Sequence, residues 1–313
     1  MDHYFFKFGR KNSIFEKNYL GKDRKEELRV GAEILPSIYY GKWRLKDYRE
    51  KTSKFSKEVN GSSDKKKQID EFFKCGSVKK RNSNKSRFWI FCDGKVYVLK
   101  PYTRIKNGPD NLKDRKGSFP KTIPSEIEKI FSRDDLPEFF ATIDSNQKYN
   151  RKTIALFRDK EKEICNHLLK NGIKNTIEIK HIECLNYLSP VQFETLIFLI
   201  FHHNNVLCST YRGGTQKGID LRIKIEGENI LKKDFKADES GQCLIQVKKK
   251  NNGKVKEQKF SGNKYLIHLG ESDKNQNILG RDWVDSQLKK LVIKKPVIKE
   301  WLQFALKGFK LKK

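Results

Sequence analysis

The 313-residue sequence lacks the marks of several large classes of protein. No apolar run approaches the roughly 20 residues of a membrane-spanning helix, so no membrane partner is expected. The six cysteines are widely separated and form no CxxC pair, and no HExxH motif is present, which argues against a zinc site. No GxxxxGK[ST] loop occurs either, so the chain is not expected to hydrolyse NTP.

Acidic residues are few relative to basic ones, with 39 Asp and Glu against 68 Lys and Arg and a formal net charge of +29. Apolar residues still make up 36% of the chain, so the excess of charge does not indicate disorder. A surface with so many uncompensated cations attracts phosphate polyanions, which makes nucleic acid the expected partner. Residues 1–6 are no signal peptide and the cysteines are expected to be reduced core residues, so a cytoplasmic location is expected.

The positive charge is concentrated in two segments, since residues 51–100 and 251–313 each carry a net charge of +9. This distribution favours two surfaces that face nucleic acid. The alternative is a lysine-rich composition that decorates every surface alike.

Residues 1–105 are predicted to form an N-terminal mixed α+β domain with a candidate role in nucleic-acid recognition. Aromatic and β-branched residues flank Asp93 and Gly94 in the segment 88–99, which is the pattern of a β-hairpin. The other elements predicted here are strands at 4–8 and 38–45, a short helix at 69–73, and polar loops at 60–67 and 79–87.

Three aromatic residues of this domain, Trp43, Tyr48 and Trp89, are interpreted as core residues, because aromatic side chains at strand spacing usually face the interior. The alternative is that they stack on bases, which would make the domain a reader of modified or flipped nucleotides.

Prolines and acidic pairs characterise residues 106–175, which are predicted to be a connecting helical region. Its last element is a helix at about 159–171, with Gly172 as the C-cap. The second domain is predicted over residues 176–313, beginning with a strand at 177–182.

A buried helix is predicted to begin after Ser189. Ser189 at the N-cap, Pro190 at N1 and Gln192 at N3 form the pattern of a capping box. Residues 191–201 are apolar nearly all round, and Glu194 is their only charge. A carboxylate in a buried helix needs a cation or hydrogen-bond donors, unless it faces solvent near the helix N-terminus.

Two predicted strands that follow carry a second acid and a lysine. The strand after Gly218 begins with Asp220. Because side chains alternate along a strand, the side chain of Asp220 points to the face opposite that of Ile219 and Leu221. On the strand that begins at residue 242, Gln246 and Lys248 are two residues apart and share one face. An acid on one strand and a polar-x-Lys pair on the next is typical of metal-dependent nucleases.

Phosphodiester hydrolysis requires a divalent cation that binds the scissile phosphate and lowers the pKa of a water molecule. Mg²⁺ prefers oxygen ligands, and the predicted ones are Asp220, Glu194, the amide oxygen of Gln246 and the main-chain carbonyl of Val247, with Mn²⁺ as a substitute ion. Lys248 is expected to orient the attacking water or to offset developing charge. The predicted catalytic residues are therefore Asp220, Gln246, Lys248 and Glu194.

These residues resemble the PD-(D/E)xK nuclease superfamily, and in particular its Mrr-like restriction endonuclease branch. The matching pieces lie within about 180–270 and are Phe193-Glu194-x-Leu196, Gly213-Gly214-Thr215-x-x-Gly218-Ile219-Asp220 and Ile245-Gln246-Val247-Lys248. In that branch, Gln often replaces the acid before x-Lys. The resemblance implies a four-stranded mixed sheet flanked by helices, Mg²⁺-dependent cleavage of DNA and often a homodimer.

Basic residues accompany the predicted site, and four of them are predicted to contact nucleic acid: Arg212, Lys217, Lys249 and Lys250. The rest of the domain is predicted to contain a strand at 264–269 and helices at 282–291 and 296–309. Their lysines form either a surface that binds the nucleic-acid backbone or a solvated helix face.

The leading hypothesis is a DNA endonuclease of restriction or phage-defence type, of α+β or α/β fold class. Its C-terminal restriction-endonuclease-like domain would cut DNA, and its N-terminal domain would help to select the target. One alternative is a non-catalytic DNA-binding protein on a degenerate nuclease fold, which the neutral Gln246 favours. Another is an RNA-directed nuclease, because nothing in the sequence distinguishes a 2′-hydroxyl.

Overall fold

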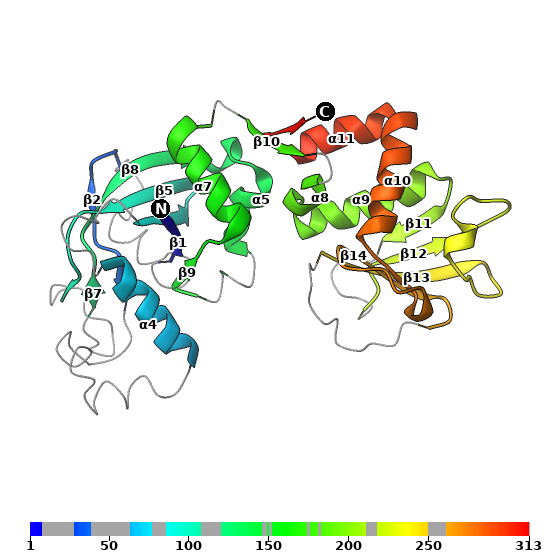
Figure 1. Cartoon of the computed structure of the whole chain (residues 1–313), viewed down its shortest axis with the longest axis horizontal. Helices are drawn as coiled ribbons and strands as arrows, with labels where there is room; N and C mark the ends of the chain where they lie inside the picture. Colours follow the sequence, from blue (N-terminus) through cyan, green and yellow to red (C-terminus); the bar gives the residue numbers. More distant parts are fainter. Residues whose placement is uncertain are drawn as a thin grey trace. The chain divides into compact units, whose positions relative to one another are not determined.

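The protein divides into two compact units, residues 1–177 and residues 178–313 (Figure 1). Both units combine helices with β-sheets, so the α+β class is confirmed. None of the helices described is long and apolar enough to cross a membrane. The computed structural model describes residues 1–7, 28–38, 63–76, 86–107, 120–145, 149, 152–173, 176–180, 183–210, 218–249 and 261–312.

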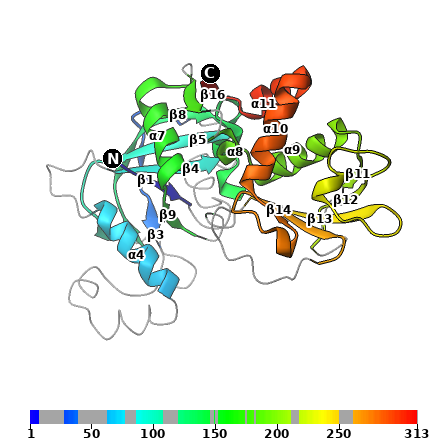
Figure 2. The same cartoon turned by 45° about the vertical axis from the view of Figure 1, so that its right-hand side comes forward.

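The first unit is built on a six-stranded sheet in the order β2-β8-β5-β4-β1-β9, of which Figure 2 shows the last five strands side by side. Its centre is the predicted hairpin, which is confirmed: Asp93 and Gly94 have φ angles of 50° and 69°, as a tight two-residue turn requires. The strands are β1 (Asp2–Phe6), β2 (Glu33–Ile34), β4 (Ser86–Cys92), β5 (Lys95–Pro101), β8 (Ser125–Ser132) and β9 (Ile154–Leu156).

Helices cover both faces of this sheet, because alternate residues of the central strands are apolar on both sides. On one face, Phe72 of α4 (Ser63–Gly76) packs against Phe88, with ring centroids 6.5 Å apart. On the other face, Trp89 contacts Phe140 of α5 (Glu138–Ala141) at 5.4 Å, and α7 (Asp159–Asn171) packs against β1. Trp89 is fully buried, which confirms its assignment to the core. Trp43 and Tyr48 lie outside the described residues.

Within 106–175, the predicted helix at about 159–171 with Gly172 as the C-cap is confirmed as α7, but the prediction that the region only connects two domains is wrong, because it supplies β8 and β9 to the main sheet. They also supply β6 (Lys106–Asn107) and β7 (Lys121–Thr122), which pair with β3 (Ser37–Ile38) in a three-stranded sheet. Pro120, Pro124 and Pro137 each stand directly before an element. A proline is compatible with the first residues of strands and helices, so here it marks boundaries and does not exclude the sheet. Two 3-10 turns, Arg133–Asp135 and Ile143–Ser145, complete this region.

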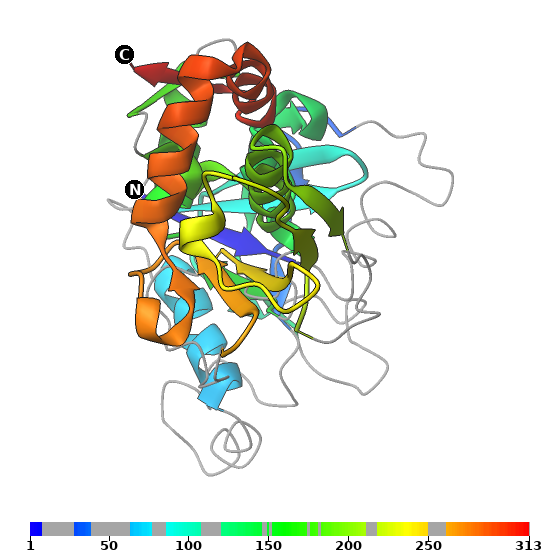
Figure 3. The same ribbon diagram turned by 90° about the vertical axis from the view of Figure 1, so that its right-hand side faces the viewer.

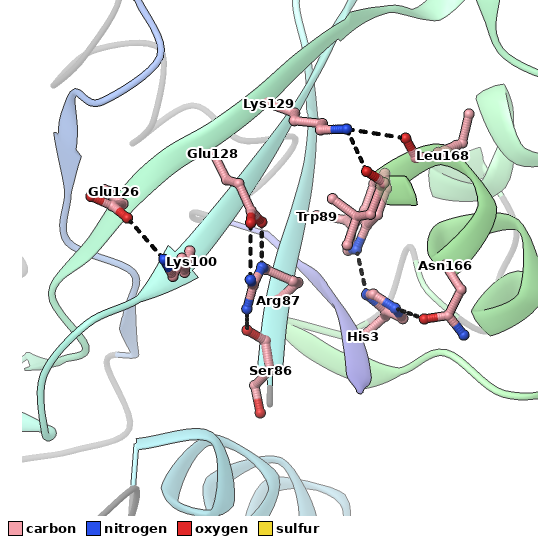
Figure 4. A network of polar contacts seen from close by, with 11 residues as sticks. His3, Ser86, Arg87, Trp89, Lys100, Glu126, Glu128, Lys129, Asn166 and Leu168 are labelled. Atoms are coloured by element: carbon pink, nitrogen blue, oxygen red, sulfur yellow. Dashed lines mark hydrogen bonds and ion pairs between the residues drawn. The ribbon is translucent and has the colours of Figure 1, made fainter. Parts of the chain in front are cut away.

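Two predicted polar loops are also partly structured. Residues 63–67 form the first turns of α4, where Asp64 is favoured near the helix N-terminus. Ser86 and Arg87 belong to β4. Arg87 is buried and forms an ion pair with Glu128 of β8 (Figure 4). Buried pairing of this kind lets a charged residue lie in a central strand.

A second polar network of this unit is centred on His3 of β1. The imidazole is fully buried, and burial lowers its pKa from 6.5 to about 4. Trp89 Nε1 donates a hydrogen bond to Nδ1 over 3.2 Å, and Nε2 lies 2.9 Å from Asn166 Oδ1 on α7 (Figure 4). Since both ring nitrogens have partners, the neutral imidazole is satisfied in the core.

The second unit is built on a five-stranded mixed sheet in the order β11-β12-β13-β14-β15. β11, β12 and β13 are antiparallel neighbours, whereas β13, β14 and β15 are parallel. The strands are β11 (Leu207–Thr210), β12 (Leu221–Lys224), β13 (Gln242–Lys248), β14 (Lys264–His268) and β15 (Ile278–Leu279), with the 3-10 turns η8 (Lys232–Asp234) and η9 (Lys274–Gln276). The helices are α8 (Cys184–Tyr187), α9 (Pro190–His203), α10 (Arg281–Lys294) and α11 (Pro296–Ala305).

Most predicted elements of this unit are confirmed, including the capping box at Ser189, where Gln192 N donates to the Ser189 hydroxyl. The last predicted helix, 296–309, ends at Ala305, because Gly308 turns the chain with a φ of 85°. The chain then forms β16 (Phe309–Lys312), which pairs with β10 (Ile177–Lys180). The six cysteines of the chain are free, and five of them are buried, as expected for core residues.

Candidate active site

Asp220 is fixed by the main chain at the beginning of β12. Its N–H donates to the carbonyl oxygen of Ile245 at 2.9 Å, which extends the pairing of β12 with β13 by one residue. Its carboxylate oxygen Oδ2 accepts a hydrogen bond of 2.7 Å from the N–H of Val247. Since Leu221 pairs with Ile245, Asp220 lies level with Gln246 on the neighbouring strand.

Lys248 comes from the same face of β13 as Gln246, because side chains alternate along a strand. Its Nζ lies 3.5 Å from Oδ2 of Asp220, and the two side chains are 42% and 24% exposed. The ion pair is therefore partly open to solvent.

Gln246 occupies the buried part of this face and is 9% exposed. Within the described part of the chain, its side-chain amide forms no hydrogen bond. A Cβ added to Gly218 would lie 3.8 Å from Gln246 Nε2, so the turn before Asp220 passes close to this amide. The φ of Gly218 is 85°, a left-handed conformation that favours glycine at this turn.

Glu194 lies on α9, which packs against β13. Its carboxylate is half-buried, and it has no hydrogen bond or ion pair with any described residue. Burial raises the pKa of Glu194, the negative charge of Asp220 raises it further, and the positive charge of Lys248 lowers it. Glu194 therefore lies within electrostatic reach of both Asp220 and Lys248.

The four predicted catalytic residues thus belong to one location in the second unit. The two carboxylates and the Gln246 amide offer hard oxygen donors, which suit Mg²⁺ or Mn²⁺ better than a soft metal ion. No group of three or more His, Cys, Asp or Glu side chains in the described residues has the arrangement of a metal site. A metal ion here would therefore depend on two acids, with neutral oxygens and water completing its ligands.

The predicted nucleic-acid contacts are only partly described. Arg212, Lys217 and Lys250 lie outside the described residues. The ammonium group of Lys249 donates to the main-chain carbonyls of Asn186 and Leu188, so it stabilises the end of α8 and the approach to α9. Its contact with nucleic acid stays a prediction.

The main-chain contacts of Asp220 are the part of the site that sequence patterns do not reveal. The sequence predicts that Val247 offers its carbonyl oxygen to the metal, and that role stays a prediction. The structure assigns to Val247 the N–H that holds Asp220. Any residue except proline supplies such a donor, so no sequence signal marks it.

No protein-family model matches the chain, and the comparisons with curated proteins and with solved structures found no match. The chemistry of this site is therefore inferred from its own residues and distances.

Proposed function

We propose that the protein is a divalent-metal-dependent DNA endonuclease that hydrolyses phosphodiester bonds. The observation that carries this proposal is the Glu194 carboxylate, half-buried without a hydrogen bond among the described residues and close enough to Asp220 for its pKa to rise. Two neighbouring carboxylates repel each other, and a bound divalent cation relieves this repulsion. Lys248, whose ammonium lies 3.5 Å from Asp220, can stabilise the negative charge that develops during phosphodiester hydrolysis.

Each residue has a distinct task in this proposal. When bound, Mg²⁺ or Mn²⁺ polarises the scissile phosphate and acidifies a water molecule. Asp220 holds the ion on a carboxylate already oriented by the Val247 N–H, and Glu194 contributes a second carboxylate from α9. Lys248 orients the attacking water or stabilises the negative charge that develops on the oxygens of the scissile phosphate. Gln246 offers a neutral amide oxygen.

The fold and the charge support the same proposal. A helix followed by three antiparallel strands and a parallel fourth strand is compatible with the resemblance to PD-(D/E)xK nucleases. The net charge of +29 favours a polyanionic partner. We further propose a restriction or phage-defence role in the cytoplasm, with target selection by residues 1–177 and action as a homodimer.

The neutral Gln246 favours a second candidate function, a DNA-binding protein without cleavage activity. An amide gives a metal ion one negative charge fewer than a carboxylate, which weakens the attraction for a divalent cation. The two candidates differ in one measurable property, because only the nuclease produces new DNA ends.

Cleavage of supercoiled plasmid tests the proposal directly. Purified protein is incubated with EDTA, Mg²⁺ or Mn²⁺, and matched RNA serves as a second substrate. Asp220→Asn and Lys248→Ala should each reduce metal-dependent cleavage by on the order of a hundredfold or more. Exposed residues of the same unit provide matched controls, and Glu239→Gln and Lys264→Ala should cleave like the wild type.

Three outcomes decide the matter. Undiminished cleavage by Asp220→Asn would overturn the assignment of the site. DNA binding without cleavage in the presence of either metal ion would support the second candidate function, a non-catalytic DNA-binding protein. Preferential cleavage of RNA would identify RNA as the substrate. Mn²⁺ binding, measured by electron paramagnetic resonance, gives a readout apart from activity: it should weaken in Asp220→Asn and in Glu194→Gln but not in Glu239→Gln.

A further inference from the structure

A cavity of about 540 Å³ lies in the second unit and shares no residue with the candidate active site. It is bounded by the η8 turn with the residues after it, by Tyr265 of β14, by β15 with the loop that precedes it, and by one face of α10. Figure 3 shows these segments close to one another, with η8 in yellow beside α10. The volume is within the range of pockets that bind small molecules, roughly 300–1,000 Å³.

One residue of the lining carries a side-chain amide for which the described residues supply no hydrogen-bond partner. Gln287 of α10 lines the cavity and is 5% exposed. Its side chain forms no hydrogen bond with the described residues. A side-chain amide that lines a cavity without a protein partner is open to water or to a ligand. A carboxamide has a hydrogen-bond donor and an acceptor side by side. It therefore suits a ligand with an acceptor and a donor that are adjacent in the complementary order.

Three aromatic side chains form one wall. Phe235 lies between Tyr265 and Trp283, with ring centroids 4.9 Å and 5.9 Å from theirs. The polar atoms of this wall are already occupied: Trp283 Nε1 donates to Asp234, and the Tyr265 hydroxyl accepts from the N–H of Lys236. The wall therefore offers carbon surface, which favours a flat apolar group.

The rim is cationic. Lys233, Lys236 and Lys290 are exposed and line the opening. The lining also contains two acids, Asp234, which accepts from Trp283, and Asp282, which accepts from the Ser272 hydroxyl, so three lysines against two aspartates leave it a formal net charge of +1. The rim is therefore suited to a negatively charged group such as phosphate.

We infer that this cavity binds a nucleotide unit, with the base against Gln287 and the aromatic wall and the phosphate at the three lysines. Nucleobases are flat and carry adjacent donors and acceptors, and Gln pairs with such edges through two hydrogen bonds. A free mononucleotide and a nucleotide turned out of a nucleic acid share this chemistry. The inference does not depend on the metal site.

Fluorescence of Trp283 provides the readout. The full chain is titrated with the mononucleotides of the common bases, and with ribose 5-phosphate and inorganic phosphate as ligands without a base. Nucleotides should quench the emission with saturation, and Trp283→Phe should remove most of this change. Ribose 5-phosphate should bind at least about tenfold more weakly, because it lacks the base.

Two variants and one matched control test the residues. Gln287→Leu and Lys290→Ala should each weaken binding about tenfold or more. Lys289 is the exposed neighbour of Lys290 on α10 but does not line the cavity, so Lys289→Ala should bind like the wild type. The melting temperature of Gln287→Leu should stay close to that of the wild type, so that weaker binding reflects the lost amide and not a loss of fold; a large fall would indicate a structural role for Gln287.

The source of the nucleotide is distinguished with single-stranded and bulged oligonucleotides that contain 2-aminopurine. If the cavity binds a nucleotide flipped out of a nucleic acid, the fluorescence of an unpaired 2-aminopurine should change on binding to the wild type but not to Gln287→Leu. Mononucleotides should then bind only weakly. Equal affinity for nucleotides and ribose 5-phosphate would overturn the inference. So would a Gln287→Leu variant that binds every probe as tightly as the wild type. Asp220→Asn should leave every result unchanged, which separates this site from the proposed nuclease.

Discussion

Acidification should destabilise the unit of residues 1–177 through His3. Trp89 donates to Nδ1 of the buried imidazole, and Asn166 Oδ1 accepts from Nε2–H. The ring is therefore neutral with its proton on Nε2, as these two partners require. A second proton on Nδ1 would face the N–H of Trp89 and would have to be accommodated without water.

The size of the effect is set by the two pKa values. The unfolded chain binds a proton at His3 as the pH falls through about 6.5, whereas the folded one stays neutral until about pH 4. The unfolded state then binds more protons, so the stability is complete above about pH 6.5 and is lost as the pH falls towards 4. The loss is roughly 1 kcal/mol at pH 5.5 and roughly 2–3 kcal/mol at pH 4.5.

Urea unfolding at pH 7.5, 5.5 and 4.5 measures this loss, with pulsed hydrogen exchange of peptides from β1 and β4 as the readout of this unit. Between pH 7.5 and 4.5, the wild type should lose about 2–3 kcal/mol more than His3→Gln. His167→Gln, one residue from Asn166 on α7, is the control and should lose as much as the wild type. Equal losses in the wild type and His3→Gln would refute the reasoning.

Two further predictions concern residues 178–313. Asp220→Asn should lower the pKa of the Glu194 carboxyl and Lys248→Ala should raise it, because the charge of Asp220 opposes ionisation and that of Lys248 favours it. A carbon-13 NMR titration of the Glu carboxyls measures both shifts. Gly280→Ala should cost about 2–3 kcal/mol in urea unfolding, because a Cβ there would lie 2.4 Å from the main-chain oxygen of Gly270.

Each of these predictions has a control in the same unit. Glu239→Gln should leave the pKa of Glu194 unchanged, and shifts of the same sign in both site variants would contradict the proposed arrangement. Gly227→Ala tests the glycine prediction, because a Cβ at Gly227 would meet no atom within 4 Å and only its φ of 61° opposes the substitution. That variant should cost about 1 kcal/mol, and a similar cost for Gly280→Ala would show that the close backbone approach is tolerated.

Elements whose geometry depends on adjacent residues could be predicted from the sequence. The turn at Asp93 and Gly94 needs two residues that adopt positive φ, and Asp-Gly is one of the few pairs that do so readily. The helix after Ser189 needs an N-cap oxygen and a returning side chain three residues later. In both cases the interacting groups are neighbours in the sequence, so the pattern contains the whole interaction.

The pairing of distant strands could not be predicted in this way. Alternation identifies β1 as a strand, but it does not indicate that Tyr4 lies opposite both Phe88 and Leu156. Prolines likewise mark interruptions without indicating whether the next element is a strand or a helix. The sequence therefore predicts the segment 106–175 as a connection, although it completes the sheet.

Of the candidate site, the residue types could be predicted, whereas their contacts could not. Alternation places Gln246 and Lys248 on one face of β13. The proximity of Glu194 to Asp220 depends on how α9 packs against β13, which no local pattern specifies. The cavity around Gln287 draws its lining from four separate segments, so the sequence offers no sign of it.

The position of β1 between β4 and β9 has a consequence for how the first unit can be divided. Residues 1–105 alone would keep β1, β4 and β5 but would lose β8 and β9, their outer neighbours. Two strand edges buried in the whole unit, one on β1 and one on β5, would then present unpaired N–H and C=O groups to other chains. A fragment cut there is expected to aggregate, whereas residues 1–177 keep both strands covered and are suited to separate expression.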